Sequence, residues 1–109
     1  MATRQEVLEG FDKTLAKIRE QARHFRMWNK NMQYHFEDLG EAWFISINEG
    51  EPAQPQEGVA DGAEIVYRMD SDTFVGIVGG SISGMDAWKQ GKVKLQASAM
   101  DMMKLQKLN

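Results

Sequence analysis

Residues 63–74, with the sequence AEIVYRMDSDTF, contain the change of pattern on which the fold prediction depends. Every second residue from Ile65 to Met69 is large and apolar, which is typical of a strand with one buried face. Asp70-Ser71-Asp72 then supplies polar residues that can cap a helix, and residues 73–78 are predicted to form it before two glycines. The stretch therefore predicts a strand followed directly by a short helix.

The sequence after this stretch predicts two more helices on either side of a further strand. Ser83 can cap a second short helix, which is expected to end before Gly91. In residues 93–97 apolar side chains alternate with Lys94 and a glutamine, and this alternation predicts a strand. A final helix is predicted over about residues 99–108.

The sequence before the stretch predicts a long helix and a hairpin. Thr3-Arg4-Gln5-Glu6 has the spacing of a capping box, and apolar residues at helical spacing predict an amphipathic helix over about residues 3–25. Alternation in residues 32–36 and again in residues 43–47 predicts two antiparallel strands joined by a polar turn. Residues 48–62 include two prolines and are interpreted mainly as loop, which allows a short edge strand.

The element order and the composition together define the class of protein. The order α-β-β-(β)-β-α-α-β-α predicts an α+β fold in one domain over residues 1–109. The absence of cysteine excludes disulfides, cysteine–zinc sites and thiol catalysis, and the net charge of -3 argues against nucleic acid as a partner. With no apolar run approaching the ~20 residues of a membrane helix and a polar start, we expect a cytoplasmic protein.

The sequence offers little for catalysis or metal binding. Its two histidines are His24 and His35, and the pattern that surrounds a nucleophilic serine in hydrolases is absent. His35 and Glu37 project from one side of a predicted strand, but two ligands without a third make a poor metal site. We therefore expect no enzyme activity, no metal and no cofactor, and an enzyme that uses His35 with Glu37 ranks last among the hypotheses.

The final helix carries a group of methionines and one unexpected polar residue. On a helical wheel one arc holds Ala99, Met102, Met103 and Gln106, and the opposite side holds Asp101, Lys104 and Lys107. Gln106 is thus predicted on the apolar face, where either a backbone group, an ordered water or the polar end of an apolar ligand would satisfy it. Methionine is flexible and suits a surface that accepts apolar ligands, although it also serves as ordinary core.

Four segments in this order resemble the type-2 sterol carrier protein family: residues 63–69, residues 70–74 (DSDTF), residues 87–95 (AWKQGKVKL) and residues 103–106 (MKLQ). With the hairpin, the resemblance covers about three-quarters of the chain. It implies a mostly antiparallel five-stranded sheet covered by helices, an apolar tunnel for lipids, and an edge strand near residues 51–58. The chain departs from the family's pattern at residues 79–84 and at residues 96–99, near the expected rim of the tunnel.

The leading hypothesis is non-catalytic binding and transfer of a fatty acid, an acyl-CoA or a similar apolar ligand. The residues expected to bind it are Phe74, Ile77, Trp88, Met102, Met103 and Gln106, with Gln106 orienting the head group. Lysines expected to attract an anionic head group or a transient membrane contact are Lys92, Lys94, Lys104 and Lys107. The alternative is a protein-interaction or dimerisation module with a filled core, which pairs with itself or with a partner enzyme.

Overall fold

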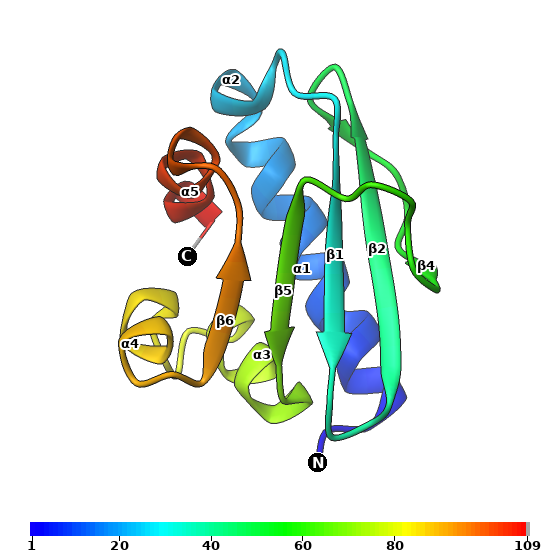
Figure 1. Ribbon diagram of the computed structural model, residues 1–109, viewed down its shortest axis with the longest axis vertical. Coiled ribbons are helices and arrows are strands. Elements are labelled where there is room, and N and C mark those ends of the chain that lie inside the picture. Colours follow the sequence, from blue (N-terminus) through cyan, green and yellow to red (C-terminus); the bar gives the residue numbers. More distant parts are fainter. Residues whose placement is uncertain (109) are drawn as a thin grey trace.

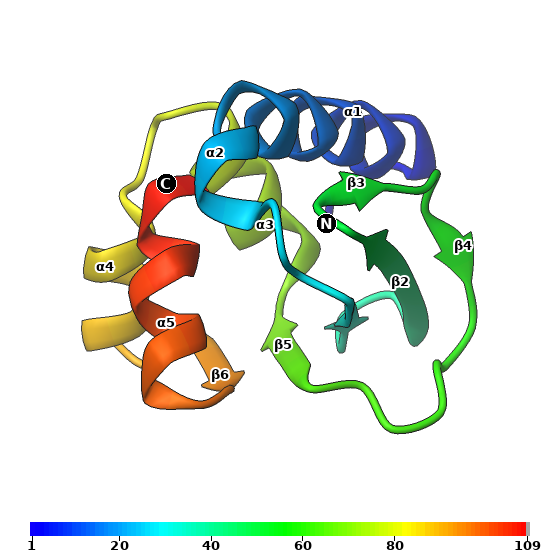
Figure 2. The same ribbon diagram turned by 90° about the horizontal axis from the view of Figure 1, so that it is seen from above.

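The computed structural model describes residues 1–108, and it contains one mixed sheet with α1 and α3 against one face and α4 and α5 beside β6 (Figures 1 and 2). The helices are α1 (Arg4–Glu20), α2 (Ala22–Phe25), α3 (Ser71–Val78), α4 (Gly84–Lys89) and α5 (Ala99–Leu105), followed by the 3-10 turn η1 (Gln106–Leu108). The strands are β1 (Lys30–Phe36), β2 (Glu41–Asn48), β3 (Glu51–Pro52), β4 (Gln56–Glu57), β5 (Ile65–Met69) and β6 (Val93–Gln96). The predicted α+β class is confirmed.

The sheet is mostly antiparallel, as predicted. Its strand order is β3-β2-β1-β5-β6, with β4 also paired to β2, and β1 with β5 is the parallel pair. The register places Tyr34 of β1 opposite Tyr67 of β5, and Tyr67 opposite Leu95 of β6. These three side chains therefore lie side by side on the face that the helices cover.

The edge strand expected near residues 51–58 is present but divided. Pro52 pairs with Ile47 and Gln56 pairs with Phe44, so three residues of the edge segment oppose two residues of β2. The extra residue makes a β-bulge, and Pro55 within it has no amide hydrogen to donate to the ladder. The predicted five-stranded sheet thus has five strands in the order β3-β2-β1-β5-β6, and a sixth, short strand, β4, pairs with β2 along the same edge as β3.

The first helix is shorter than predicted, although its start is confirmed. The Thr3 hydroxyl accepts from the Glu6 amide at 3.1 Å, and the Glu6 carboxylate accepts from the Thr3 amide at 3.0 Å. The helix breaks at Gln21, and α2 follows in place of the expected continuation to residue 25. The break lets Phe25 pack edge-on against Trp28 at 4.9 Å, and both side chains are buried.

An aromatic cluster joins the helices to the sheet. The ring of Phe11 on α1 lies 5.1 Å from Tyr34, 4.9 Å from Phe74 of α3, and within 6.0 Å of Phe36 and Trp43. Aromatic pairs at these separations add to the free energy gained from burying their apolar area. The core is therefore densely packed over β1 and β2, beneath α1.

The start of α3 is held by a residue distant in the sequence. The helix begins at Ser71, two residues earlier than predicted, and Asp70 occupies the N-cap position without a capping bond from its side chain. Instead the Asp38 carboxylate accepts from the Ser71 amide at 2.9 Å and from the Ser71 hydroxyl at 2.6 Å. The same buried hydroxyl accepts from the Ala2 amide at 2.9 Å, so Ser71 ties the start of the chain to the β1–β2 turn.

We expect the substitution Ser71→Ala to lower the free energy of unfolding by about 1–2 kcal/mol at neutral pH, because it leaves the buried Ala2 amide without its acceptor. Partial burial raises the pKa of the Asp38 carboxyl, but the hydrogen bonds from Ser71 outweigh burial and leave this pKa below its ordinary value of 3.8. A depressed folded-state pKa stabilises the fold at neutral pH, and this contribution is lost as the pH falls through it. Urea titrations should therefore show the difference from wild type shrinking below pH 3.8.

The variant Asp38→Asn is the control for this pH dependence, because it removes the titrating carboxylate and keeps a side chain of similar size. Its stability should fall less steeply in acid than that of the wild type. A Ser71→Ala variant that is as stable as wild type, or a difference that does not change with pH, would contradict this account of the clamp.

Candidate functional site

A cavity of about 400 Å³ lies between the helices and the part of the sheet formed by β5 and β6. Every helix except α2 contributes to its walls, and β1, β5 and β6 form its floor. The residues that line it are Lys13, Thr14, Lys17, Tyr34, Tyr67, Met69, Phe74, Ile77, Val78, Gly84, Met85, Trp88, Val93, Leu95, Met102, Leu105, Gln106 and Leu108. A cavity of this size is in the range of small-molecule sites, which begins at roughly 300 Å³.

The interior of the cavity is apolar. Met69, Phe74, Val93, Leu105 and Leu108 line it, and each of these side chains is buried. They come from β5, α3, β6, α5 and η1, so the space closes only when the C-terminal segment packs over the sheet. Such walls favour a hydrocarbon chain, because burying it removes apolar area from water.

The rim of the cavity, in contrast, is polar and partly aromatic. We use the name rim for its exposed lining residues, Lys13, Lys17, Met85, Trp88 and Gln106. Lys13 and Lys17 are one turn apart on α1, so both ammonium groups lie on the same side of the opening. The site therefore offers two positive charges where the apolar interior meets water.

Five of the six predicted site residues line this cavity. Phe74 is in its interior, Ile77 and Met102 are half-buried on its walls, and Trp88 and Gln106 lie at its rim. Met103 does not line it: this side chain is 68% exposed and extends from the outer side of α5. Whether these residues bind a ligand stays a prediction.

The orientation predicted for the final helix is wrong. Asp101, placed by the sequence analysis on the solvent side, is buried and accepts a 3.0 Å ion pair from Lys30 of β1. Lys104 likewise turns inward and donates to the His24 carbonyl at 2.7 Å. Gln106, expected on the buried face, is exposed, and its carboxamide makes no hydrogen bond within residues 1–108. The buried face is thus the one that carries Asp101 and Leu105.

The lysines predicted to attract an anionic head group are not at the cavity. Lys92, Lys94, Lys104 and Lys107 are absent from its lining, and Lys13 and Lys17 occupy the rim instead. These two lysines were not predicted, because they belong to the first helix, far from the C-terminal segment in the chain. Their spacing of four residues beside the buried Thr14 is the signal that could have indicated them.

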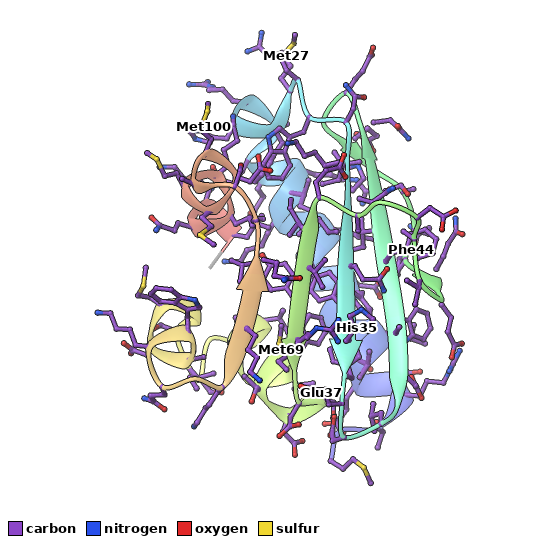
Figure 3. All side chains as sticks on the ribbon, viewed as in Figure 1. Met27, His35, Glu37, Phe44, Met69 and Met100 are labelled. Atoms are coloured by element: carbon purple, nitrogen blue, oxygen red, sulfur yellow. The ribbon has the colours of Figure 1, made fainter. Side chains whose placement is uncertain are left out.

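His35 and Glu37 are on the opposite side of the sheet from the cavity. His35 is a half-buried residue of β1 beside Ala42 and Arg68, and Glu37 follows the end of that strand (Figure 3). Burial and the nearby Arg68 charge lower the pKa of the His35 imidazole. Among the described residues, no three His, Cys, Asp or Glu side chains are grouped to hold a metal ion. The pair therefore has no connection to the cavity.

Comparison with known proteins identifies the family. The chain belongs to the SCP-2 sterol transfer family, whose sequence model matches residues 11–109. No curated protein sequence is detectably similar to the chain. None of the helices in residues 1–108 has the length and hydropathy needed to cross a membrane.

Solved structures of low sequence identity share this fold. The solution structure of palmitated sterol carrier protein 2 like 2 from Aedes aegypti has a TM-score of 0.73 and 18% identity, over 98% of this chain and 94% of that one. The apo form of sterol carrier protein 2 from Yarrowia lipolytica has a TM-score of 0.58 and 18% identity, over 82% of this chain and 79% of that one. At these identities the similarity establishes the fold.

The same fold also occurs as part of a larger enzyme. The inverting sec-alkylsulfatase Pisa1 from Pseudomonas sp. matches 89% of this chain at 19% identity and a TM-score of 0.62. The chain covers 14% of that enzyme, and 12% of a double mutant of the same sulfatase. The matched fold is therefore found both as nearly the whole of a carrier protein and as a small part of an enzyme.

Proposed function

We propose that the chain binds a single-chain anionic lipid, such as a fatty acid or an acyl-CoA, and carries it without changing it chemically. The observation that supports this most directly is the apolar cavity of about 400 Å³ with two lysines at its rim. Burying a hydrocarbon chain there contributes roughly 25 cal/mol for each Å² of apolar surface removed from water, against the cost of association. The palmitated mosquito protein supports the same ligand class for this fold.

The charges at the rim favour one orientation of the ligand. A carboxylate or phosphate near Lys13 and Lys17 keeps its hydration and lies beside two cations. In the apolar interior the same group would have neither water nor a cation around it. The hydrocarbon chain then extends between α5 and the sheet. Gln106, at the same rim, makes no side-chain hydrogen bond within residues 1–108, and its carboxamide can donate to the head group.

Exposed apolar residues support a transient membrane contact during loading. Met85 and Trp88 belong to the rim and are 42% and 50% exposed. Two more exposed methionines, Met27 and Met100, extend from the end of the molecule near α2 and α5 (Figure 3). Partial insertion of such side chains into a bilayer surface would bring the cavity opening to the lipid that it takes up.

A carrier role fits the side chains of the cavity better than catalysis does. Its described lining contains no His, Asp or Glu, and the Thr14 hydroxyl already donates to the Gly10 carbonyl at 3.0 Å. The alternative of an interaction module predicts an interior filled by side chains, and the cavity of about 400 Å³ argues against such filling. Pairing with a second copy or with a partner enzyme stays a prediction.

The test is direct binding to the delipidated protein. Palmitate should displace a fluorescent fatty acid at micromolar concentrations, and native mass spectrometry of protein from cells that naturally make it should detect a bound lipid. The absence of a co-purified lipid, together with no displacement by fatty acids or by acyl-CoA, would refute the proposal.

The rim lysines give a sharper prediction. Reversing both charges with Lys13→Glu and Lys17→Glu should weaken palmitate binding by about tenfold, because exposed charge pairs contribute up to about 1 kcal/mol each. The loss should shrink as salt is added, since the screening length falls to about 3 Å at 1 M. Displacement titrations at low and high salt measure both effects.

The matched control reverses two lysines that do not line the cavity. Lys92→Glu with Lys107→Glu changes the net charge by the same amount and should leave palmitate affinity within about twofold. Hexadecanol, which has no charge, should bind both double variants equally. Equal losses in the two double variants would mean that overall charge, and not the rim, attracts the head group.

A further inference from the structure

Two tyrosines in the cavity have hydroxyls without hydrogen-bond partners among residues 1–108. Tyr34 and Tyr67 are 4% and 8% exposed, and neither hydroxyl takes part in a hydrogen bond within residues 1–108. Every fully enclosed side-chain nitrogen or oxygen in this part of the chain does have a partner. Both hydroxyl oxygens must therefore reach open space, and the cavity is the space that both residues line.

The strand register holds the two hydroxyls as a pair. Tyr34 and Tyr67 are directly opposite each other in the parallel β1–β5 ladder, so both point to the helix-covered face. Their rings are stacked with centroids 4.8 Å apart and an angle of 11° between the planes. Phe11 and Phe74 pack against the Tyr34 ring in edge-on contacts, which restrict its position. The two hydroxyls are thus preorganised neighbours in an otherwise apolar interior.

The protonation state of these hydroxyls determines which ligand groups they can bind. Burial raises the pKa of both tyrosine hydroxyls well above the ordinary value, so both remain neutral donors at physiological pH. The remaining hydroxyl in the lining, that of Thr14, already uses its proton in the bond to Gly10. A hydroxyl that an apolar ligand chain separates from water loses a hydrogen bond, and an acceptor on the ligand would recover it.

We propose that Tyr34 and Tyr67 bind a neutral oxygen substituent on the ligand's hydrocarbon chain, so that the preferred cargo is a hydroxylated or oxo fatty acid. This inference rests on the proposed lipid-binding function and narrows its ligand class. The substituent oxygen accepts from one or both tyrosine hydroxyls, while the carboxylate stays at the rim with Lys13 and Lys17. A carboxylate would not take the inner position, because no cation lies among the buried lining residues.

The experiment compares palmitate with a series of monohydroxylated palmitates, in which the hydroxyl moves from the carbon beside the carboxylate to the terminal carbon. In the delipidated wild type, at least one isomer should bind about tenfold more tightly than palmitate, the gain that one recovered hydrogen bond gives. Tyr34→Phe and Tyr67→Phe should each reduce this gain, and the double variant should abolish it. Palmitate itself is the comparison ligand, and its affinity should not fall in any of the three variants, because its hydrocarbon chain offers the hydroxyls no acceptor.

The outcomes separate this inference from the proposed function. If palmitate binds and no hydroxylated isomer binds more tightly, or if the gain persists in the double variant, the tyrosine site is refuted and lipid binding stands. If palmitate itself loses about tenfold in the phenylalanine variants, the carboxylate occupies the inner position and the inference is wrong. If no ligand of the series binds, both proposals fail. Because the hydroxyls make no hydrogen bond to the described part of the chain, thermal unfolding should show that the phenylalanine variants remain as stable as wild type.

Discussion

Replacing Met102 with tryptophan should weaken palmitate binding by about 10- to 100-fold while the protein stays folded. Met102 is half-buried on α5 and lines the cavity, so the larger indole would occupy space that the ligand needs. Forcing extra atoms into an occupied site costs about 1–3 kcal/mol, which corresponds to this range of affinity. Displacement of a fluorescent fatty acid measures the loss, and thermal unfolding should show no decrease in stability, because the indole fills an empty volume.

The neighbouring residue provides the matched control for this prediction. Met103 is on the same helix and is 68% exposed outside the cavity, so Met103→Trp makes the same chemical change without entering it. Its palmitate affinity should stay within about twofold of wild type. Equal affinities for the two variants would show that the lipid does not occupy the space beside α5. The two variants also test the predicted site residues Met102 and Met103, of which only Met102 lines the cavity.

Replacing Gly50 with alanine should cause the largest loss of stability, about 2–5 kcal/mol. Gly50 has a φ of 83°, and its amide donates to the Trp28 carbonyl at 3.0 Å. An added Cβ would lie 2.5 Å from the Phe25 carbonyl oxygen and 2.9 Å from the Arg26 Cα, both of them backbone atoms that cannot rotate away. The left-handed conformation contributes about 1–2 kcal/mol and the steric overlap about 1–3 kcal/mol.

A second glycine separates these two contributions. Gly62 has a similar left-handed conformation, with a φ of 63°, but nothing lies within 4 Å of the position that an alanine Cβ would take there. Gly62→Ala should therefore cost only about 1 kcal/mol, the backbone contribution alone. Urea denaturation of both variants measures the difference. Equal losses would indicate that the β2–β3 turn moves freely away from the α2–β1 connection.

Local sequence signals predicted most of the fold. The capping box at Thr3 and Glu6, the alternation in β1 and β2, and the serine cap of α4 depend on residues close in the chain, and each is confirmed. The break at Gln21 accompanies the packing of Phe25 against Trp28, and the bulge near Pro55 depends on pairing with β2. Neither leaves a periodic signal in the sequence.

The site was less predictable, and Asp101 shows why. A carboxylate is ordinarily assigned to the solvent side of a helix, and its partner Lys30 is 71 residues away in the chain. The alternative stripe formed by Asp101, Leu105 and Leu108 also has helical spacing, so periodicity alone could not choose between the two faces. The face that is buried determines which side chains line the cavity. Met103 does not line it, and Gln106 lines it from an exposed position. The pairing of Tyr34 with Tyr67 likewise required the β1–β5 register.

The divided edge segment disfavours the addition of strands from other copies of the protein. A long, flat outer strand can recruit a strand from another molecule and so begin a fibril. On one border of the sheet the ladder is interrupted by the bulge and by two prolines, and on the other β6 is four residues long and carries Lys94. Neither border offers an uninterrupted template. The protein can therefore contain an open cavity without presenting a sheet edge to which strands of other copies could add.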